Sequence, residues 1–311
     1  MKYIFGPVPS RRLGRSLGVD PIPLKTCNYQ CIYCQLGRTT NFTNERKNYI
    51  PKDQICMELE LAVELSEKNM DFVTFVGSGE PTLYKDLKEL ILKAKELTKK
   101  PICVITNGSL LKEPDVRDAL FNADLIIPSF DAGDNDLFIK INRPHPKLSF
   151  NQIIKGLVDF KKEYSGKLWI EIMLIKDIND SRKELLKIKE KIDFIRPDRI
   201  DINVPIRPPT ETWVAIPTKR VKSILTEIFD EYIDLNVLEN GLFQIYSSNF
   251  EKEVLSIIQR HPMREDQIIK TFTSANLSKD IIVLKLKELE SEKRIKNWKY
   301  IGKSYWKLNF N

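Results

Sequence analysis

The sequence predicts an α/β protein built on a parallel sheet, followed by a smaller module with a different pattern. From residue 17 to about residue 232, short apolar runs rich in β-branched residues alternate six times with longer amphipathic runs. Strands that alternate with helices imply a parallel sheet with right-handed crossovers. Six such units suit a partial (β/α)6 barrel, and a doubly wound sheet is the alternative, because periodicity alone does not separate the two. A chain of 311 residues is long enough for this domain and a small second one.

Six short runs read as buried strands, because both of their faces are largely apolar or β-branched. The first is LGVDPIP, residues 17–23, just before a cysteine-rich loop. The others are residues 71–76, 101–106, 124–129, 167–174 and 198–204.

Amphipathic runs between these strands read as helices. In residues 84–97, Leu87, Leu90, Ile91 and Ala94 recur at helical spacing, with Lys and Glu between them. The same reading holds for residues 53–68, 149–164, 180–195 and about 218–232.

Past residue 233 the alternation stops. Residues 235–248 could add one strand. A helix is then expected to begin with a capping box of Ser248 and Glu251. A short helix over about 264–272 should follow it.

A third helix is expected from the N-cap Ser278, and two β-runs lie around Gly302 and Lys303. Three helices and a hairpin in about sixty residues predict a winged helix-turn-helix. The expected domains are therefore residues 1–247 and residues 248–311.

Composition and charge limit the class of protein. No apolar run reaches the roughly 18 residues of a membrane helix, and the N-terminus does not read as a signal peptide, so we expect a cytoplasmic protein without a membrane partner. Residues 1–50 carry eight Lys and Arg against two acids, and residues 250–311 carry thirteen against eight. Basic ends hint at a polyanionic partner, although Lys-rich helices also serve solubility alone.

Three of the five cysteines, Cys27, Cys31 and Cys34, lie on one loop with the spacing C-x3-C-x2-C. In a reducing cytoplasm, such thiols are metal ligands or nucleophiles before they are disulfides. A [4Fe–4S] cluster is usually held by four thiolates, so three leave one iron open to an external ligand. Zinc is the alternative, but it would need a fourth Cys or His nearby.

This spacing, with Tyr33 directly before the last cysteine, resembles the signature of the radical S-adenosylmethionine superfamily. The resemblance extends over about residues 15–235. Within the superfamily, the chain resembles the iron–sulfur oxidoreductases grouped with the wyosine synthases of transfer RNA, although it lacks their additional cysteines for a second cluster.

The resemblance implies a TIM-like partial barrel, a [4Fe–4S] cluster, S-adenosyl-L-methionine as cofactor, and an electron donor such as ferredoxin or flavodoxin. It also implies a reaction. Reductive cleavage of S-adenosylmethionine yields a 5′-deoxyadenosyl radical, which abstracts hydrogen from the substrate. The enzyme would be an oxidoreductase or a transferase.

Candidate cofactor contacts follow the strands, because the working face of a βα barrel lies at the C-terminal ends of its strands. The run Gly77, Ser78, Gly79 and Glu80 comes directly after residues 71–76. The resemblance implies that it binds the methionine amino group, for which Glu80 offers a carboxylate. The alternative is a glycine-rich turn in which Glu80 is only a charge at a helix N-terminus.

Further candidates end other strands, and the resemblance implies contacts with the ribose, the sulfonium region or the adenine. They are Thr106, Asn107, Ser129, Asp131, Lys176 and Asn203. Each could be only a turn or cap residue. Tyr33 is expected to face the adenine or to pack under the loop.

Three arginines, Arg11, Arg12 and Arg15, precede the first predicted strand. Arginine forks suit carboxylates or phosphates, and an exposed basic β-hairpin is the alternative. His145 is a candidate substrate contact or proton carrier, or simply a solvated loop residue.

The C-terminal module interleaves basic and aromatic residues, a pattern that fits RNA docking, peptide or protein docking, or a structural role alone. The residues are Lys279, Lys285, Lys287, Lys296, Lys299 and Lys303 with Trp298, Tyr300 and Tyr305. The substrate is therefore expected to be macromolecular, with transfer RNA (RNA modification) first and a peptide second. The alternative is a metal- or cluster-bearing nucleic-acid-binding regulator without radical chemistry.

Overall fold

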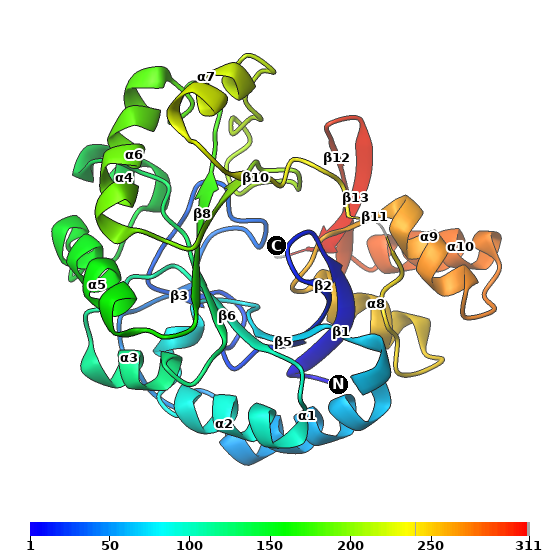
Figure 1. Cartoon of the computed structure of the whole chain (residues 1–311). Coiled ribbons are helices and arrows are strands. Elements are labelled where there is room, and N and C mark those ends of the chain that lie inside the picture. The colour runs from blue at the N-terminus through cyan, green and yellow to red at the C-terminus, as the bar shows by residue number, and fades with distance from the viewer. Residues whose placement is uncertain (240, 310–311) are drawn as a thin grey trace.

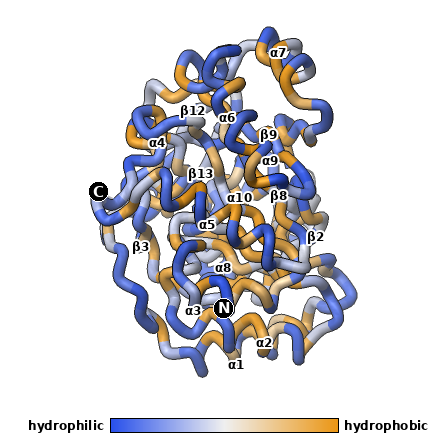
Figure 2. The backbone as a smooth tube through the Cα atoms, turned by 60° about the vertical axis from the view of Figure 1, so that its left-hand side comes forward, coloured by the Kyte–Doolittle hydropathy of each residue, from blue (hydrophilic) through white to orange (hydrophobic). Residues whose placement is uncertain are grey.

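The computed structural model describes residues 1–239 and 241–309. Within these residues the main sheet has eight strands, in the order β1-β2-β5-β6-β7-β8-β9-β10. The sheet curls into a half-barrel, with helices α1 to α7 on its outer side (Figure 1). Apolar and hydrophilic residues alternate along outer helices such as α1 and α2, as expected for helices that cover a sheet on one face (Figure 2).

The six predicted strands are confirmed, and from β2 onward neighbouring strands run parallel. Their bounds are Gly14–Val19 (β2), Phe72–Phe75 (β5), Ile102–Thr106 (β6), Leu125–Pro128 (β7), Lys167–Met173 (β8) and Arg199–Asn203 (β9). Because they follow one another without a reversal of order, the sheet is not doubly wound. A short β10, Ile233–Asp234, adds to β9, and β1, Ile4–Ser10, forms an antiparallel hairpin with β2.

The predicted helices are also confirmed. Their bounds are Lys52–Ser66 (α1), Leu87–Leu97 (α2), Phe150–Glu163 (α5), Arg182–Ile195 (α6) and Val221–Ile228 (α7). Helix α3 (Pro114–Leu120) completes the third of the six expected strand–helix units, for which no helix bounds were given, and the short helix α4 (Asn135–Asn142) was not predicted. The side chain of Asp134 caps α4 by accepting the N–H of Leu137 at 2.9 Å.

Small elements surround the cysteine loop. Strands β3 (Thr26–Cys27) and β4 (Asn41–Phe42) pair in parallel on either side of it, and a short 3-10 helix at Pro81–Leu83 follows the glycine-rich segment; a second one, Glu67–Asn69, follows α1. Within the part of the chain described, no helix has both the length and the apolar character needed to cross a membrane.

The C-terminal part contains the three expected helices and the hairpin. The elements are α8 (Phe250–Ile258), β11 (Met263–Arg264), α9 (Glu265–Thr273), α10 (Lys279–Ser291), β12 (Ile295–Tyr300) and β13 (Lys303–Leu308), with a sheet order β11-β13-β12. This order fits the expected winged helix-turn-helix, and the assignment of residues 248–311 as a separate domain of that kind stays a prediction. Residues 310 and 311 lie outside the described part.

Two local predictions for this region were wrong and one is confirmed. The N-cap of α8 is Asn249, whose side chain accepts the N–H of Lys252 at 2.9 Å, so no capping box forms from Ser248. The described residues of 235–248 form no strand, and residue 240 lies outside the description. Ser278 caps α10 as expected, with its Oγ accepting the N–H of Ile281.

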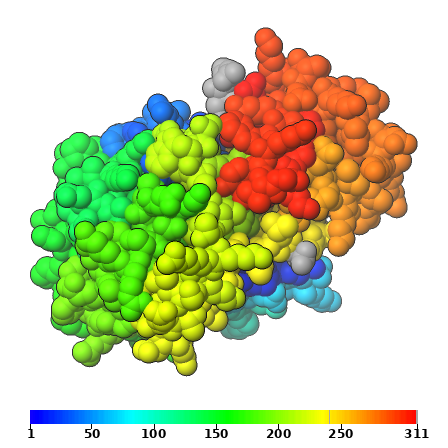
Figure 3. Space-filling model, turned by 90° about the horizontal axis from the view of Figure 1, so that it is seen from above, coloured from blue at the N-terminus to red at the C-terminus, as the bar shows by residue number. Residues whose placement is uncertain are grey.

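The C-terminal part packs directly on the barrel. Phe5 and Val8 of β1 share one apolar cluster with buried residues of α8, α9, α10 and β13. The hydroxyls of Tyr300 and Tyr305 donate to the carbonyl oxygens of Pro205 and Ile206 at 2.7 and 2.8 Å. In the space-filling view, the C-terminal hairpin (red) lies against the yellow-green part of the chain (Figure 3). The open side of the half-barrel is therefore covered near the end of β9.

Candidate functional site

The three cysteines border the C-terminal end of the sheet. Cys27 ends β3, and Cys31 and Cys34 follow on the loop toward β4; all three are free and partly exposed. Two backbone hydrogen bonds tie this loop to the segment after β5, from Lys25 N to Ser78 O (2.6 Å) and from Glu80 N to Thr26 O (3.1 Å). The predicted cysteine and glycine-rich segments therefore lie side by side.

Gly79 makes this approach possible. A Cβ at this position would overlap the carbonyl oxygen of Thr26. Glycine is thus required here for close packing of two backbones.

Nitrogen donors surround the thiols. The sulfur of Cys27 accepts from the backbone N–H of Tyr29 (3.4 Å) and from Asn107 Nδ2 (3.8 Å), and Cys31 Sγ accepts from Asn142 Nδ2 (3.6 Å). Burial nevertheless raises the pKa of all three thiols. These thiols would become thiolates when a metal displaces their protons. N–H groups that donate to the sulfur atoms are also typical of the thiolates that bind iron–sulfur clusters.

Within the described residues, no group of three His, Cys, Asp or Glu side chains is arranged as it stands to hold a metal ion. The fit to a cluster rests on the donor set instead, three thiols on one loop with amide donors at their sulfurs. The assignment of Cys27, Cys31 and Cys34 as cluster ligands stays a prediction.

Glu80 is buried and connects the segment after β5 to the end of β6. Its Oε1 accepts from Thr82 N (3.0 Å), Thr82 Oγ1 (2.6 Å) and Thr106 Oγ1 (2.6 Å), and its Oε2 accepts from Asn107 N (2.7 Å). Burial raises the pKa of Glu80, while these hydrogen bonds oppose the increase. A ligand ammonium could reach only Oε2, because three donors already occupy Oε1.

Ser78 is turned toward the protein interior. Its hydroxyl and N–H both donate to the carboxylate of Asp20, at 2.6 and 3.1 Å. Arg260, two residues after the end of α8, forms an ion pair with the same carboxylate at 2.5 Å. The glycine-rich segment is thus connected to the C-terminal part of the chain.

Asp131 is a buried acceptor at the centre of the site. Its Oδ2 accepts from the hydroxyl of Tyr33 (2.6 Å) and from Asn142 Nδ2 (2.7 Å), and its Oδ1 accepts from Met173 N (2.8 Å). Burial raises the pKa of Asp131, and the hydrogen bonds from Tyr33, Met173 and Asn142 oppose the increase. The carboxylate orients Tyr33 and Asn142, so little of it remains for the expected ribose contact.

Sequence reasoning missed Asn28 and Asn142. Asn28 accepts from Asn107 Nδ2 at 2.7 Å and donates to Ser109 Oγ at 2.8 Å, and so orders the surroundings of Cys27. Asn142 ends α4, the short helix that was not predicted. Asn28 lies on the cysteine loop itself, directly after Cys27, but its partners Asn107 and Ser109 are distant in sequence, and only the tertiary fold brings Asn142 to the loop.

The remaining candidates are placed differently. Ser129 is half-buried beyond β7, where its backbone bridges to Glu171. Lys176 is exposed and lies 3.9 Å from the carboxylate of Asp177. His145 packs against Phe42 beside a different hollow.

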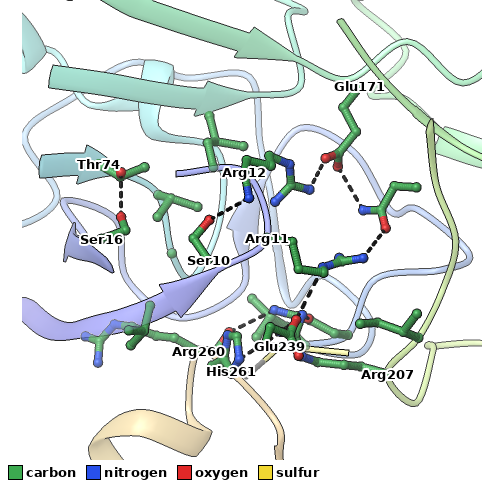
Figure 4. Close-up of a pocket in the computed structure, with 18 of the residues that line it drawn as sticks. Ser10, Arg11, Arg12, Ser16, Thr74, Glu171, Arg207, Glu239, Arg260 and His261 are labelled. Atoms are coloured by element: carbon green, nitrogen blue, oxygen red, sulfur yellow. Dashed lines mark hydrogen bonds and ion pairs between the residues drawn. The ribbon is translucent and has the colours of Figure 1, made fainter. Parts of the chain in front are cut away.

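A cavity of about 320 Å³ occupies the barrel interior, which we call the lumen (Figure 4). Five predicted site residues line it: Cys31, Tyr33, Cys34, Gly77 and Asn203. The other predicted site residues do not line the lumen: Cys27, Ser78, Gly79, Glu80, Thr106, Asn107, Ser129, Asp131 and Lys176. The lumen therefore opens directly onto two of the three cysteines.

The turn of the β1–β2 hairpin inserts two arginines into the lumen. Arg11 donates to Asn203 Oδ1 at 2.8 Å and lies 3.4 Å from the carboxylate of Glu239, and Arg12 forms an ion pair with Glu171 (Figure 4). The expected alternative of a β-hairpin is thus correct for the backbone. The prediction that this hairpin is exposed is wrong for Arg11 and Arg12, which are partly buried; of the three arginines, only Arg15 is exposed.

The C-terminal part closes one wall of the lumen. Arg207, after β9, donates to Gln35 Oε1 at 2.9 Å, forms an ion pair with Glu239 and lies 2.8 Å from His261 Nε2. Burial, together with the charge of Arg207, lowers the pKa of His261 to about 3. The imidazole is therefore neutral near pH 7.

Comparison with known proteins agrees with this geometry. The model of the family described as "Radical SAM superfamily" matches residues 22–188. "UPF0026 protein MJ1312" of Methanocaldococcus jannaschii is 36% identical over 99% of this chain and 97% of its own length. "GTPase Obg" of Brachyspira hyodysenteriae is 50% identical over 65% of this chain, and the match covers only 29% of the length of that relative.

Solved structures show the same fold. Streptococcus suis SuiB bound to S-adenosylmethionine matches 72% of this chain and 50% of its own, with a TM-score of 0.52 and 17% identity. TYW1 with a lysine-pyruvate adduct covers 96% of this chain and 82% of its own at 18% identity, with a TM-score of 0.47. The half-barrel sheet is therefore of the kind found in SuiB.

Proposed function

The chain belongs to the radical SAM superfamily, whose enzymes bind a [4Fe–4S] cluster and S-adenosylmethionine. From this premise we propose that Cys27, Cys31 and Cys34 hold such a cluster beside the lumen. When bound, the cluster and S-adenosylmethionine would supply one-electron reductive cleavage of the S–C5′ bond, with methionine as the leaving group, and hydrogen-atom abstraction from the substrate. The chain's own residues hold these groups in position and exclude water.

One observation carries the proposal: three free thiols on one short loop, two of them facing the lumen, with nitrogen donors at the sulfurs of Cys27 and Cys31. Around them, Glu80 Oε2 is the oxygen left to accept a methionine ammonium. Tyr33, held by Asp131, supplies an aromatic face for the adenine.

The proposal is tested on anaerobically reconstituted protein. Reduced protein given S-adenosylmethionine should release 5′-deoxyadenosine, measured by liquid chromatography with mass spectrometry. Cys31→Ala should lose both iron and this product. Cys56→Ala, at a partly buried thiol on α1, is the matched control and should keep both. A protein that binds the cluster but releases no 5′-deoxyadenosine would instead be the regulator considered above.

The substrate is proposed to be macromolecular, with transfer RNA first and a peptide second. Lysines of α10 and β12 support an RNA contact, whereas Tyr300 and Tyr305 use their hydroxyls on barrel carbonyls and do not support one. The fold likeness to SuiB, solved with its precursor peptide SuiA, motivates the second choice.

Binding of transfer RNA to the full-length chain, measured against salt, separates the two substrates. RNA binding should weaken steeply as salt rises, because each phosphate contact releases counterions. A slope near zero would favour the peptide. An electron donor such as ferredoxin or flavodoxin belongs to the same proposal.

A further inference from the structure

Arg12 has spare hydrogen-bonding capacity inside the lumen. Its ion pair with Glu171 of β8 uses Nη2. Its Nε is buried and has no hydrogen-bond partner among the residues that the structure describes. A guanidinium carries five N–H donors, and a buried donor without a partner costs free energy. Arg12 therefore has donors left for a bound acceptor.

Hydroxyl groups that line the same cavity are also donors, and Ser16 and Thr74 lie on the side of Arg12 opposite to Glu171 in the view of Figure 4. The Oγ of Ser10 accepts the N–H groups of Arg12 and Leu13, each at 3.3 Å, so its own proton remains to donate. The buried hydroxyls of Ser16 and Thr74 lie 2.6 Å apart. One of them donates to the other, which leaves one further hydroxyl proton. Glu171 Oε2 is the one buried acceptor of the lumen that lacks a hydrogen-bond partner among the described residues, so these donors outnumber it.

The charges show the same imbalance. The lumen is lined by Arg11, Arg12, Arg207 and Arg260, and the carboxylates paired with them are Glu171, Glu239 and Asp20. One positive charge is left over where Arg11 and Arg207 share Glu239, next to the pair of Arg12 and Glu171, and His261 is neutral. Burial and the neighbouring Arg11 lower the pKa of Arg12 to about 9. An uncompensated buried cation is costly, so a bound anion would stabilise this arrangement.

Arg11 and Arg207 are the better satisfied arginines. Arg11 donates to Asn203 and to the carbonyl of Leu235, and Arg207 contacts Gln35, Glu239 and His261. Arg12 is therefore the arginine with donors left for a ligand.

We propose that the lumen binds an oxyanion of the substrate, a carboxylate or a phosphate group, through Arg12 and the hydroxyls of Ser10, Ser16 and Thr74. An arginine fork matches both kinds of oxyanion with two parallel hydrogen bonds. The anion site itself does not depend on the proposed function, but the assignment of the anion to the substrate does. Because the lumen also opens onto Cys31 and Cys34, the anion would anchor the substrate in the same cavity as the radical chemistry.

The test measures the thermal unfolding midpoint of the reconstituted full-length protein with inorganic phosphate or acetate, against sodium chloride at equal ionic strength. A specific anion at about a hundred times its Kd should raise the midpoint by roughly 5 °C. An effect of phosphate alone assigns a phosphate group, and one of acetate alone assigns a carboxylate. No rise beyond chloride overturns the proposal.

The variants isolate Arg12. In the double variant Arg12→Gln with Glu171→Gln, both charges are removed, so no buried carboxylate is stranded, and the specific rise should disappear. Arg12→Lys keeps the charge without the fork and should raise the Kd about tenfold. Arg15→Gln, exposed on the same hairpin, is the control and should respond as the wild type does. A rise that persists in the double variant refutes the site.

Two further measurements separate the possible failures. If saturating S-adenosylmethionine abolishes the rise, the anion is the carboxylate of the cofactor, and the assignment to the substrate is overturned. On the same preparation, release of 5′-deoxyadenosine without an anion effect refutes the anion site alone. An anion effect without 5′-deoxyadenosine refutes the proposed reaction and leaves the anion site as a binding site.

Discussion

At the scale of single residues, the site depends on buried acceptors that orient their neighbours. Asp131 receives three hydrogen bonds from Tyr33, Asn142 and Met173, and Asn142 in turn reaches Cys31. A residue of this kind determines where the groups around a cluster lie without touching the cluster itself.

Asp131→Asn tests this role. The amide would direct N–H groups at the donors of Tyr33, Asn142 or Met173, so we expect the free energy of unfolding to fall by about 1–3 kcal/mol. Iron content after reconstitution should also fall, because Asn142 loses its orientation toward Cys31. Denaturant unfolding and iron analysis measure the two effects. Asp136→Asn, exposed on α4, is the control, and an equal response of both variants would contradict the role of Asp131.

His261 gives a pH dependence. Its folded pKa is lowered to about 3 from an ordinary value of 6.5, because burial and Arg207 disfavour the imidazolium. A lowered folded pKa means that the unfolded chain binds the proton more readily, so stability is lost as pH falls from about 6.5 toward 3. His261→Asn should reduce this loss. Denaturant midpoints of both proteins between pH 7 and pH 4 measure it, and parallel curves would exclude His261 as the cause.

At the scale of elements, two chain segments must approach closely for the cysteine loop to hold its position. Gly79 lies against the carbonyl of Thr26, the residue before Cys27. Gly79→Ala should therefore displace the loop, and iron content should fall severalfold while the far-ultraviolet circular dichroism stays unchanged. Gly302→Ala, in open space at the tip of the C-terminal hairpin, should keep its iron. Full iron loading of Gly79→Ala would show that the loop tolerates the displacement.

The sequence predicted the long elements better than the groups around the cysteine loop. Strands such as Lys167–Met173 and helices such as Arg182–Ile195 carry their own periodicity, so local pattern is enough to find them. Helix α4 has only eight residues and was missed, and Asn142 was missed with it. Arg12 is polar and precedes a strand, and only tertiary structure shows that the hairpin turn enters the lumen. The ion pair of Arg12 with Glu171 joins residues that are far apart in the sequence, so no local sequence pattern could predict it.

At the scale of the whole molecule, the C-terminal part is continuous with the barrel. It shares an apolar cluster with β1, and the end of α8 brings Arg260 to Asp20. Because Asp20 also holds Ser78, a contact made by the last third of the chain supports the segment beside the cysteine loop. If the C-terminal part docks the substrate as proposed, this arrangement would connect that docking to the geometry of the proposed cofactor site.

Arg260→Gln tests that connection. Arg260 and Asp20 are both almost fully buried, and removing one partner of a buried ion pair strands the other charge, so we expect a loss of about 3–5 kcal/mol in the free energy of unfolding. The matched control is Arg294→Gln, which breaks an exposed ion pair with Glu251 and should cost less than about 1 kcal/mol. Arg260→Gln should also weaken the binding of S-adenosylmethionine, measured by calorimetry on reconstituted protein, because Asp20 no longer holds Ser78 in place. If its affinity matched that of Arg294→Gln despite a large loss of stability, the C-terminal part would stabilise the barrel without controlling the site.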